Sequence, residues 1–342
     1  RSGASGAPLR AGSDPGDRLS APLLTYLTAT NNIRKMNHAD NDHGHRGMDV
    51  VKIEVEGIGK ASPPEAVLAG LIGHGIQASR TPRMHMEEGA AIGLPYEYRL
   101  IDLPPGIGET ALAQLLNNLE DSGYRGINVT VPYKREILTH LDALSDDARA
   151  VGAVNTVLFT KAGRIGHNTD YWGFAESLRR GLPDAARDHV LLLGAGGAGH
   201  AVAHALVDAG VGRLLVSDVN RELAASLVSE LTARAGAGRA ESVTDVAVAA
   251  GTADGIVNAT PVGMLKMPGM PIDGALVEPR HWVADIVYFP LETELLAHAR
   301  TKGCAVLSGA GMALFQAVRA FELFTGMTPD ADRMKAVFDS FD

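Results

Sequence analysis

Ten residues decide the fold, and they read Val190-Leu191-Leu192-Leu193-Gly194-Ala195-Gly196-Gly197-Ala198-Gly199. An apolar run that enters G-x-G-x-x-G and continues into a helical stretch over 200–209 predicts the opening strand, turn and helix of a dinucleotide-binding unit. In such a unit Gly194 allows the tight turn, Gly196 lets the backbone approach a pyrophosphate, and Gly199 lets the helix pack on the strand. Free N–H groups at the helix N-terminus then bind the phosphates. We therefore expect residues 194–199 to contact a dinucleotide cofactor.

The next predicted strand, over 214–218, ends in an acidic residue. Asp218 follows the last glycine by about 20 residues, the separation typical of the acid that binds the ribose in such a unit. Its carboxylate can accept hydrogen bonds from a ribose diol and would repel a 2′-phosphate, which favours NAD over NADP. Arg221 lies close enough in the sequence to weaken this preference, so NADP is kept as the alternative cofactor.

Strand and helix patterns alternate along the rest of the chain. Apolar or alternating runs bounded by Gly, Pro or polar residues predict strands over 67–73, 96–101, 126–131, 255–260 and 282–287. Helices are expected after Thr81 as N-cap, over 109–122, from Pro132 onward, over 171–179 and over 312–325. Such alternation predicts parallel βαβ units and hence an α/β fold.

Length and composition restrict the class of protein. The 342 residues suggest two domains, and 46% hydrophobic with 21% charged residues argues against wholesale disorder. A net charge of −9 argues against a protein that binds nucleic-acid backbones, and no apolar run is long enough for a transmembrane helix. Cys304 is the only cysteine and no signal-peptide pattern is visible, so we expect a cytoplasmic protein.

Residues 1–64 differ from the rest and are expected to form a flexible N-terminal extension. This stretch contains a polar cluster of His38, Asp40, Asp42, His43 and His45. A metal site is one interpretation, but no periodic pattern around the cluster would hold the ligands rigidly. We therefore interpret the cluster as part of a solvated tail and expect no metal.

Two charged residues are candidates for chemistry. Lys134 lies beside Arg135 in what is expected to be the first turn of a helix, where the helix dipole and the neighbouring cation both favour the neutral amine. A neutral amine can exchange a proton with an alcohol, although a lysine extended into water is an equal alternative. Asp170 precedes a predicted helix and is either its N-cap or a partner that orients Lys134 and binds a substrate hydroxyl.

Five polar residues lie at the edges of apolar segments or on a small-residue helix face: Ser79, Thr81, Thr130, Asn155 and Gln316. Each has an ordinary structural interpretation, such as the N-cap for Thr81 or a turn for Asn155. As a group of hydroxyls and amides they would suit a polyhydroxy carboxylate.

From about residue 67 to residue 338 the chain resembles the shikimate dehydrogenase family, and its bacterial quinate/shikimate dehydrogenase branch in particular. The motifs occur in the family's order and together cover nearly everything beyond the first 65 or so residues. They are Gly70-Leu71-Ile72-Gly73, Ser79-Arg80-Thr81-Pro82, Asn128-Val129-Thr130-Val131-Pro132-Tyr133-Lys134, Gly152-Ala153-Val154-Asn155-Thr156, Asn168-Thr169-Asp170, residues 194–199 (called the glycine turn from here on), Asn258-Ala259-Thr260 and the stretch 309–316.

The resemblance implies reversible oxidation of a ring hydroxyl to a ketone, with hydride passing to a nicotinamide. It implies that Lys134 transfers the proton of the reacting hydroxyl, and that Asp170 holds this lysine and the substrate in place. It assigns the substrate carboxylate to Ser79 and Thr81, the ring hydroxyls to Thr130, Asn155 and Gln316, and further cofactor contacts to Asn258, Thr260, Val287 and Gly311. It implies no metal.

Two departures from the biosynthetic pattern favour the quinate branch. The family commonly has Ser-x-Ser where this chain has Ser79-Arg80-Thr81, and the threonine version resembles enzymes that also accept quinate. Members that use NADP typically show Asn-Arg-Thr where this chain has Ser217-Asp218-Val219-Asn220-Arg221. We therefore expect an NAD-dependent quinate/shikimate dehydrogenase, with oxidation of quinate for catabolism.

Two other functions are weighed. One is an NADP-dependent biosynthetic shikimate dehydrogenase, which would serve aromatic amino acid biosynthesis. The other is a non-catalytic sensor of quinate or shikimate on the same fold, against which the intact Lys134, Asp170 and glycine turn and the acidic charge argue. The relative use of the two substrates is not predicted.

The resemblance also implies the architecture. Residues 65–172 and 309–342 would form an α/β substrate domain, and 173–308 a doubly wound Rossmann-type NAD domain. The C-terminal helices, with Gln316, would return to the first domain, and the active site would lie in the cleft between the domains. The expected partners are small-molecule substrates, with no nucleic acid or membrane, for a monomer or homodimer.

Overall fold

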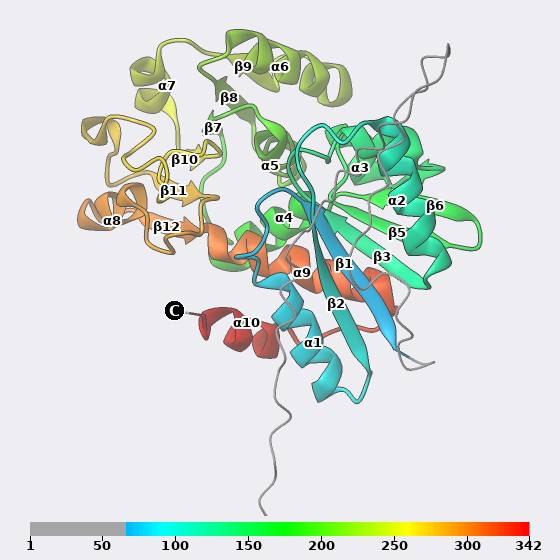
Figure 1. Cartoon of the computed structure of the whole chain (residues 1–342). Coiled ribbons are helices and arrows are strands. Elements are labelled where there is room, and N and C mark those ends of the chain that lie inside the picture. Colours follow the sequence, from blue (N-terminus) through cyan, green and yellow to red (C-terminus); the bar gives the residue numbers. More distant parts are fainter. Residues whose placement is uncertain (1–65, 342) are drawn as a thin grey trace, which may run out of the picture.

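The computed structural model describes residues 66–341, which form two six-stranded sheets joined by helices (Figure 1). The extension expected over 1–64 and the histidine and aspartate cluster between residues 38 and 45 lie outside the described residues. Within residues 66–341, no helix is long and apolar enough to cross a membrane. In the same range, no group of three His, Cys, Asp or Glu residues could hold a metal ion. The predicted α/β class is confirmed.

The first sheet is mixed, with the strand order β2-β1-β3-β5-β6-β4. Its strands are β1 (Val67–Gly73), β2 (Tyr96–Asp102), β3 (Tyr124–Val129), β4 (Ala143–Leu144), β5 (Thr156–Thr160) and β6 (Gly163–His167). The first three are parallel, as predicted, but β5 is antiparallel to both β3 and β6. β5 and β6 were not predicted as strands; they pair as an antiparallel hairpin because Lys161 and Ala162 alone separate them.

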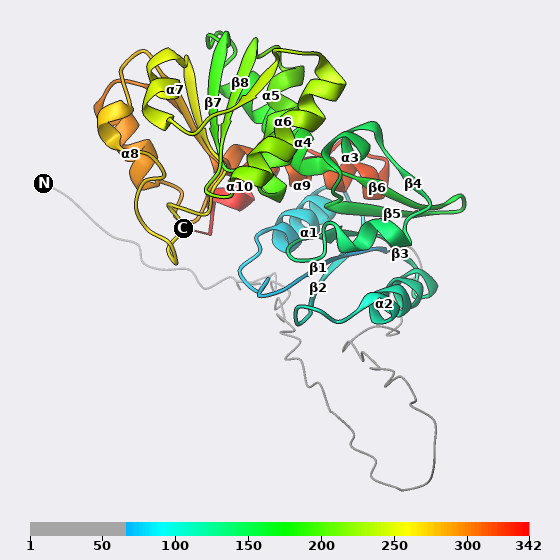
Figure 2. The same cartoon turned by 90° about the horizontal axis from the view of Figure 1, so that it is seen from above.

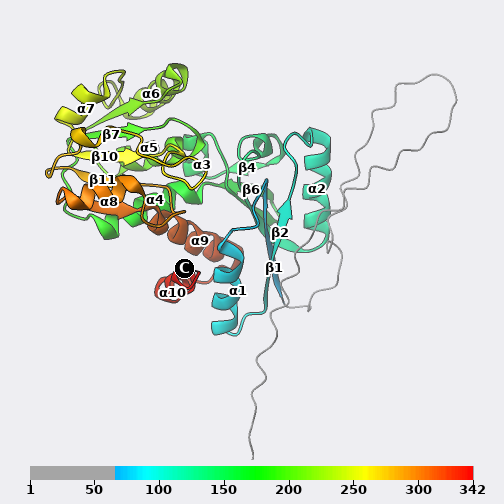
Figure 3. The same cartoon turned by 60° about the vertical axis from the view of Figure 1, so that its left-hand side comes forward.

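Helices cover both faces of the first sheet (Figure 3). On one face lies α2 (Glu109–Asp121), whose Leu112, Leu115, Leu116 and Leu119 recur every three or four residues and form a core with β1 and β3. The 3-10 helix η1 (Glu136–His140) adds Ile137 to that core. The opposite face is covered by α1 (Thr81–Ala91) and α9 (Gly309–Thr325).

The second sheet is wholly parallel, with the order β12-β11-β10-β7-β8-β9. Its strands are β7 (His189–Leu193), β8 (Arg213–Ser217), β9 (Ala240–Ser242), β10 (Gly255–Asn258), β11 (Trp282–Asp285) and β12 (Ala305–Ser308). The chain runs outward from β7 to β9 and then returns past β7 to β10. In open sheets of this kind, ligands bind where the strand order reverses, at the carboxyl ends of the strands. The second sheet therefore has the topology of a dinucleotide-binding fold.

The α-helices between the strands of the second sheet flank both of its faces (Figure 2). They are α5 (Gly197–Asp208), α6 (Arg221–Ala235), α7 (Val246–Thr252) and α8 (Glu294–Thr301). Residues of α5 and α6 pack with Val190 and Leu192 of β7, whereas residues of α7 and α8 pack with Leu191 and Leu193. Successive residues of β7 therefore face opposite layers, and this explains the continuous apolar run in the sequence. The short 3-10 helix η2 (Gly274–Leu276) precedes β11.

Two long helices connect the sheets. α4 (Thr169–Gly181) leaves the first sheet after β6, packs along α9 and contributes Phe174 and Leu178 to the core of the second sheet. α9 follows β12, with Met312 in the core of the second sheet and Ala320 and Phe324 against the first (Figure 1). The division into 65–172 with 309–342 and 173–308 stays a prediction, because α4 crosses its boundary and α9 packs on both sheets.

The last helix, α10 (Ala331–Asp339), returns to α1 through a buried carboxylate. Both oxygens of Glu88, a residue with 0% exposure, accept hydrogen bonds from the Arg333 guanidinium at 2.6 and 2.7 Å, and one also accepts from the Asp330 N–H. A buried charge that is paired and hydrogen-bonded in this way fixes the position of α10 on α1.

Three local predictions were wrong in detail. Residues 131–135 form turns and η1 follows, so no α-helix begins at Pro132; the fully buried Tyr133 side chain, whose hydroxyl donates to Pro104 O, holds the turn. α1 begins at Thr81 itself, so Thr81 is not its N-cap. The N-cap of α4 is Asn168, whose side chain accepts from the Tyr171 N–H, rather than Asp170.

A buried histidine lies between α1 and α9. His85 Nε2 lies 3.0 Å from Ala317 O, which can only accept, so Nε2 carries the proton and Nδ1 accepts from the Tyr96 hydroxyl at 3.0 Å. Burial lowers the pKa of His85 from 6.5 to about 3, and the hydrogen bond to Ala317 offsets this only in part. Between these two pH values the unfolded chain binds a proton that the folded protein does not bind.

We therefore expect His85 to make the folded protein less stable as the pH falls below about 6.5, down to about pH 3. In His85→Asn the free energy of unfolding should depend less steeply on pH, by about 1.4 kcal/mol per pH unit in the middle of this window. Urea unfolding of both proteins at several pH values measures the difference. Parallel profiles for the two proteins would contradict the assignment.

Candidate active site

A cavity of about 450 Å³ lies between the two sheets. Every residue that the sequence assigned to catalysis or to substrate lines it, namely Ser79, Thr81, Thr130, Lys134, Asn155, Asp170 and Gln316. Most of these side chains come from segments that follow β1 and β3 or precede β5, together with the first turn of α4 and the middle of α9. The second sheet contributes Ala198 of α5 and the segment after β11. The structure thus brings the predicted catalytic and substrate residues together.

Lys134 and Asp170 form an ion pair in the wall of this cavity. Lys134 Nζ donates to Asp170 Oδ2 at 2.5 Å, and the side chains are only 19% and 14% exposed. Because Asn168 caps α4, the Asp170 carboxylate is free to face the lysine. Asp170 also lies in the first turn of α4, where the helix dipole favours a negative charge. The sequence argument from a helix dipole at Lys134 does not apply, because no α-helix begins there.

A buried hydrogen-bond network fixes the start of α4 below the cavity. Asn155 Oδ1 accepts from the Thr169 N–H at 2.7 Å, and Asn155 Nδ2 donates to Thr169 Oγ1 at 3.0 Å. Thr156 Oγ1 accepts from Asn128 Nδ2 at 2.8 Å and joins the same network. An amide nitrogen has two protons, so Asn155 can position α4 and still offer a donor to a ligand.

The turn between β7 and α5 has the geometry that its glycines predicted. Gly194 has φ of +100°, which disfavours any side chain, and a Cβ at Gly199 would lie 2.2 Å from Gly194 O. At Gly196 a Cβ would meet nothing within 4 Å, so the backbone there faces open space. Gly197 opens α5 next to it. This empty space beside the N-terminus of a helix fits the pyrophosphate of a dinucleotide.

Asp218 supports this turn from the end of β8. Its Oδ2 accepts from the Ala195 N–H and its Oδ1 from the Asn220 N–H, each at 2.7 Å. Each carboxylate oxygen keeps a further lone pair that a ribose hydroxyl can use. Arg221 is exposed at the first position of α6, at the same edge of the sheet.

The remaining predicted cofactor residues follow β10 and β11 or begin α9, and several have clear structural roles. Asn258 is fully buried, and its Oδ1 accepts from both the N–H and the hydroxyl of Thr260, so it shapes the loop from within. Val287 is buried beside this loop. A Cβ at Gly311 would lie 2.1 Å from Ser177 Oγ, so this glycine permits the close packing of α9 on α4.

Asp285, at the end of β11, was missed by the sequence analysis. This carboxylate is 2% exposed and accepts from Asn258 Nδ2, the Val287 N–H and the Thr293 hydroxyl at 2.9, 3.0 and 2.7 Å. Burial raises the pKa of Asp285, and the three hydrogen bonds oppose the rise. An acid at the carboxyl end of a parallel strand, next to the switch point, was the signal available in the sequence.

Two aromatic residues of the loop after β11 also line the cavity without having been predicted. They are Tyr288 and Phe289. Burial, with the nearby Asp170 carboxylate, raises the pKa of Tyr288. The Phe289 ring lies 4.6 Å from the guanidinium of Arg80, the residue between Ser79 and Thr81. The first sheet and the second therefore meet at this rim of the cavity.

Comparison with known protein families gives two matches within the described residues. Residues 71–157 match the shikimate dehydrogenase substrate binding domain, and residues 309–337 match the shikimate 5′-dehydrogenase C-terminal domain. The chain is 50% identical over 275 residues to a shikimate dehydrogenase (NADP(+)) of Streptomyces avermitilis, which covers 80% of this chain and 94% of the relative. It is 46% identical over 278 residues to a quinate/shikimate dehydrogenase (NAD(+)) of Corynebacterium efficiens, covering 80% and 98%.

Among solved structures, the fold is similar to a quinate dehydrogenase from Corynebacterium glutamicum in complex with NAD. The TM-score is 0.76 at 45% sequence identity, and the match covers 80% of this chain and 99% of that one.

Two alanine substitutions separate the roles of the glycines. We expect Gly196→Ala to fold with an unchanged melting temperature, because its Cβ meets open space, but to bind a nicotinamide dinucleotide on the order of tenfold more weakly. Gly199→Ala should lower the melting temperature, because its Cβ would lie 2.2 Å from Gly194 O. Thermal unfolding and fluorescence titration with NADH test both variants. Equal loss of stability in the two would contradict the assignment of Gly196 to the cofactor.

Proposed function

This chain belongs to the shikimate dehydrogenase family, and from that premise we propose that it is an NAD-dependent quinate/shikimate dehydrogenase. It is an oxidoreductase that interconverts a ring hydroxyl and a ketone, in quinate and 3-dehydroquinate or in shikimate and 3-dehydroshikimate. One observation carries the proposal. The Lys134–Asp170 pair and the hydroxyl and amide side chains of Ser79, Thr81, Thr130, Asn155 and Gln316 line one cavity, which also includes Ala198 from the glycine turn.

Lys134 and Asp170 supply the acid–base chemistry in this proposal. During oxidation the Lys134 ammonium first releases a proton to water, and its free amine then accepts the substrate hydroxyl proton, while Asp170 holds the amine and accepts a hydrogen bond from the substrate. During reduction the lysine returns a proton to the carbonyl oxygen. A bound nicotinamide supplies the hydride chemistry, and the open turn at Gly196 with the N-terminus of α5 fits its pyrophosphate. Partial burial of the pair limits its contact with bulk water.

Ser79 and Thr81 suit the substrate carboxylate. Ser79 precedes α1 and Thr81 is its first residue, so both hydroxyls lie where free N–H groups and the helix dipole favour an anion. Thr130, Asn155 and Gln316 line the same cavity and offer donors and acceptors for ring hydroxyls. The cavity therefore suits a ring that carries one carboxylate and several hydroxyls.

The cofactor preference rests on Asp218. Its carboxylate is held at the end of β8 by two backbone N–H groups, so it cannot easily move aside for a 2′-phosphate. NAD is the cofactor named for the Corynebacterium relatives. An NADP-dependent shikimate dehydrogenase is the second candidate, because the relatives at 47–50% identity carry that name and Arg221 is exposed nearby.

The test of function is a steady-state matrix of quinate and shikimate against NAD and NADP. The wild-type protein should oxidise both acids and have a higher kcat/KM with NAD. In Asp218→Ala the preference should shift toward NADP by tenfold or more, since one charge repulsion is lost, about 1.4 kcal/mol or more. A wild-type preference for NADP, or a cofactor ratio that Asp218→Ala leaves unchanged, would contradict the assignment.

Substitution of the proposed proton carrier should nearly abolish turnover. We expect Lys134→Met to lower kcat by about 10²–10⁴-fold, the usual contribution of general acid–base catalysis, with the melting temperature retained. Arg135→Met is the matched control, because this neighbouring cation is exposed and does not line the cavity. Comparable turnover by the two variants would show that another group moves the proton.

A further inference from the structure

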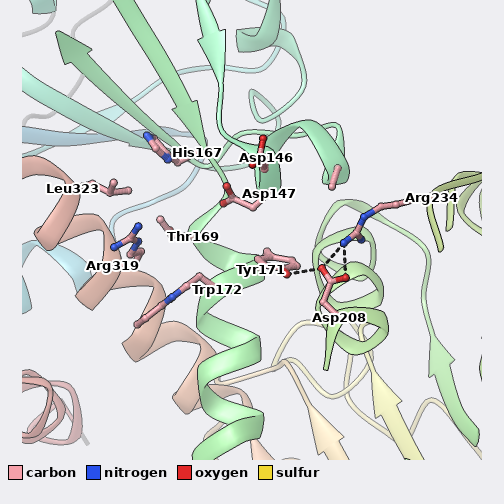
Figure 4. A pocket seen from close by; sticks show the side chains of 11 residues that line it. Asp146, Asp147, His167, Thr169, Tyr171, Trp172, Asp208, Arg234, Arg319 and Leu323 are labelled. Carbon is pink, nitrogen blue, oxygen red and sulfur yellow. Dashed lines mark hydrogen bonds and ion pairs between the residues drawn. The ribbon is translucent and has the colours of Figure 1, made fainter. Parts of the chain in front are cut away.

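A second cavity, of about 380 Å³, is lined by Thr169, Tyr171 and Trp172 of α4, whereas Asp170 of the same helix lines the candidate active site (Figure 4). Its walls come from α4, from α5 and α6 of the second sheet, from α9, and from α3 (Asp146–Val151) and the end of β6 in the first sheet. It therefore opens where elements that pack on the first sheet meet elements that pack on the second. We call this junction the seam, and the two sheets with their helices the two halves of the molecule. Nothing in the proposed reaction uses the side chains that cross this seam.

Three side chains form a continuous link across the seam, drawn with dashed lines in Figure 4. Tyr171 Oη donates to Asp208 Oδ2 at 2.6 Å, and both oxygens of Asp208 accept from the Arg234 guanidinium. Arg234 Nη1 also lies 2.7 Å from His204 Nδ1. Burial and the Arg234 charge lower the pKa of His204 to about 4, so its ring is neutral at neutral pH and Nδ1 can accept this hydrogen bond.

Tyr171 is held in place at both ends of its side chain. Burial and the hydrogen bond to Asp208 raise its pKa, so the phenol is protonated and remains a donor at any working pH. The ring packs against a small apolar cluster of Val151, Ala153 and Ala201. These residues come from α3, from the loop after it and from α5, so the ring touches both halves of the molecule.

The two elements that this link joins carry the chemistry. Tyr171 directly follows Asp170 in the first turn of α4, and consecutive helical side chains point about 100° apart, so one can face the active site while the other faces α5. Asp208 is the last residue of α5, and the glycine turn and Ala198 lie at the start of the same helix. Because an α-helix of this length is stiff, an anchor at Asp208 fixes the position of the turn as well.

We propose that Tyr171 is a positioning residue, whose hydrogen bond to Asp208 sets Asp170 in register with the helix that binds the dinucleotide. This inference rests on the proposed function. Hydride transfer is sensitive to the distance and orientation of the reacting groups, and a displacement of about 1 Å far from the chemistry can lower the rate up to 100-fold. Loss of the hydrogen bond would loosen Asp170 against the dinucleotide site without removing a group that contacts either ligand.

Tyr171→Phe is a selective test, because the ring packing is kept and Asp208 keeps Arg234 as its partner. We expect the rate of single-turnover hydride transfer with quinate or shikimate to fall about three- to tenfold. The absorbance of the NADH formed measures this rate. The Kd of NADH and the KM of the acid should stay within about twofold, and the melting temperature should be retained. A general loss of structure would instead raise both binding constants and lower the melting temperature.

Two further variants make the test specific. Tyr124→Phe removes another buried tyrosine hydroxyl, at the start of β3 and outside the cavity lining, and should leave hydride transfer unchanged. In an Asp208→Ala background, Tyr171→Phe should cause no additional loss, because the two residues act through one hydrogen bond.

An unchanged hydride-transfer rate in Tyr171→Phe, or an equal loss with and without Asp208, would overturn the inference alone. A wild-type protein that oxidises neither acid with either cofactor would overturn the proposed function, and this inference with it.

Discussion

The first turn of α4 is the constraint on which the rest of the structure depends. Asn168 caps it, Thr169 is bound to Asn155, Asp170 pairs with Lys134, and Tyr171 reaches α5. Each of these four consecutive residues therefore has a different role. In order, they cap the helix, fix its start below the cavity, form the ion pair, and join α4 to α5. These separate roles are possible because Asn168 accepts the hydrogen bond of a free N–H at the helix start. The Asp170 carboxylate is therefore not needed as a cap.

Patterns that are local in the sequence predicted most of the fold. The apolar run 190–193 became β7 because a central parallel strand is buried on both faces, and the glycine turn followed as expected. The family assignment is confirmed as well. Prediction failed where tertiary packing decided the outcome. The buried Tyr133 side chain holds a turn where a helix was expected. The β5–β6 hairpin was not predicted, although its two-residue connection is local in the sequence.

Motif order identified candidate residues that the structure places around one cavity, but their catalytic and binding roles stay predictions. Motifs could not reveal residues that act through other residues. Asp285 matters because it binds Asn258, Thr293 and the Val287 backbone, which are dispersed in sequence. Arg80 lies between two candidate ligands, and only its stacking on Phe289 shows that it ties the loop after β11 to the start of α1.

The return of the last two helices to the first sheet has a consequence for synthesis on the ribosome. On the face of the first sheet where α1 covers β2, the strands β1, β3 and β5 are covered by α9, and α10 closes over α1 through Glu88 and Arg333. These helices emerge last, after the whole second sheet. During translation the nascent first half therefore carries an uncovered apolar surface and an unpaired Glu88, a natural site for chaperone capture until release of the finished chain.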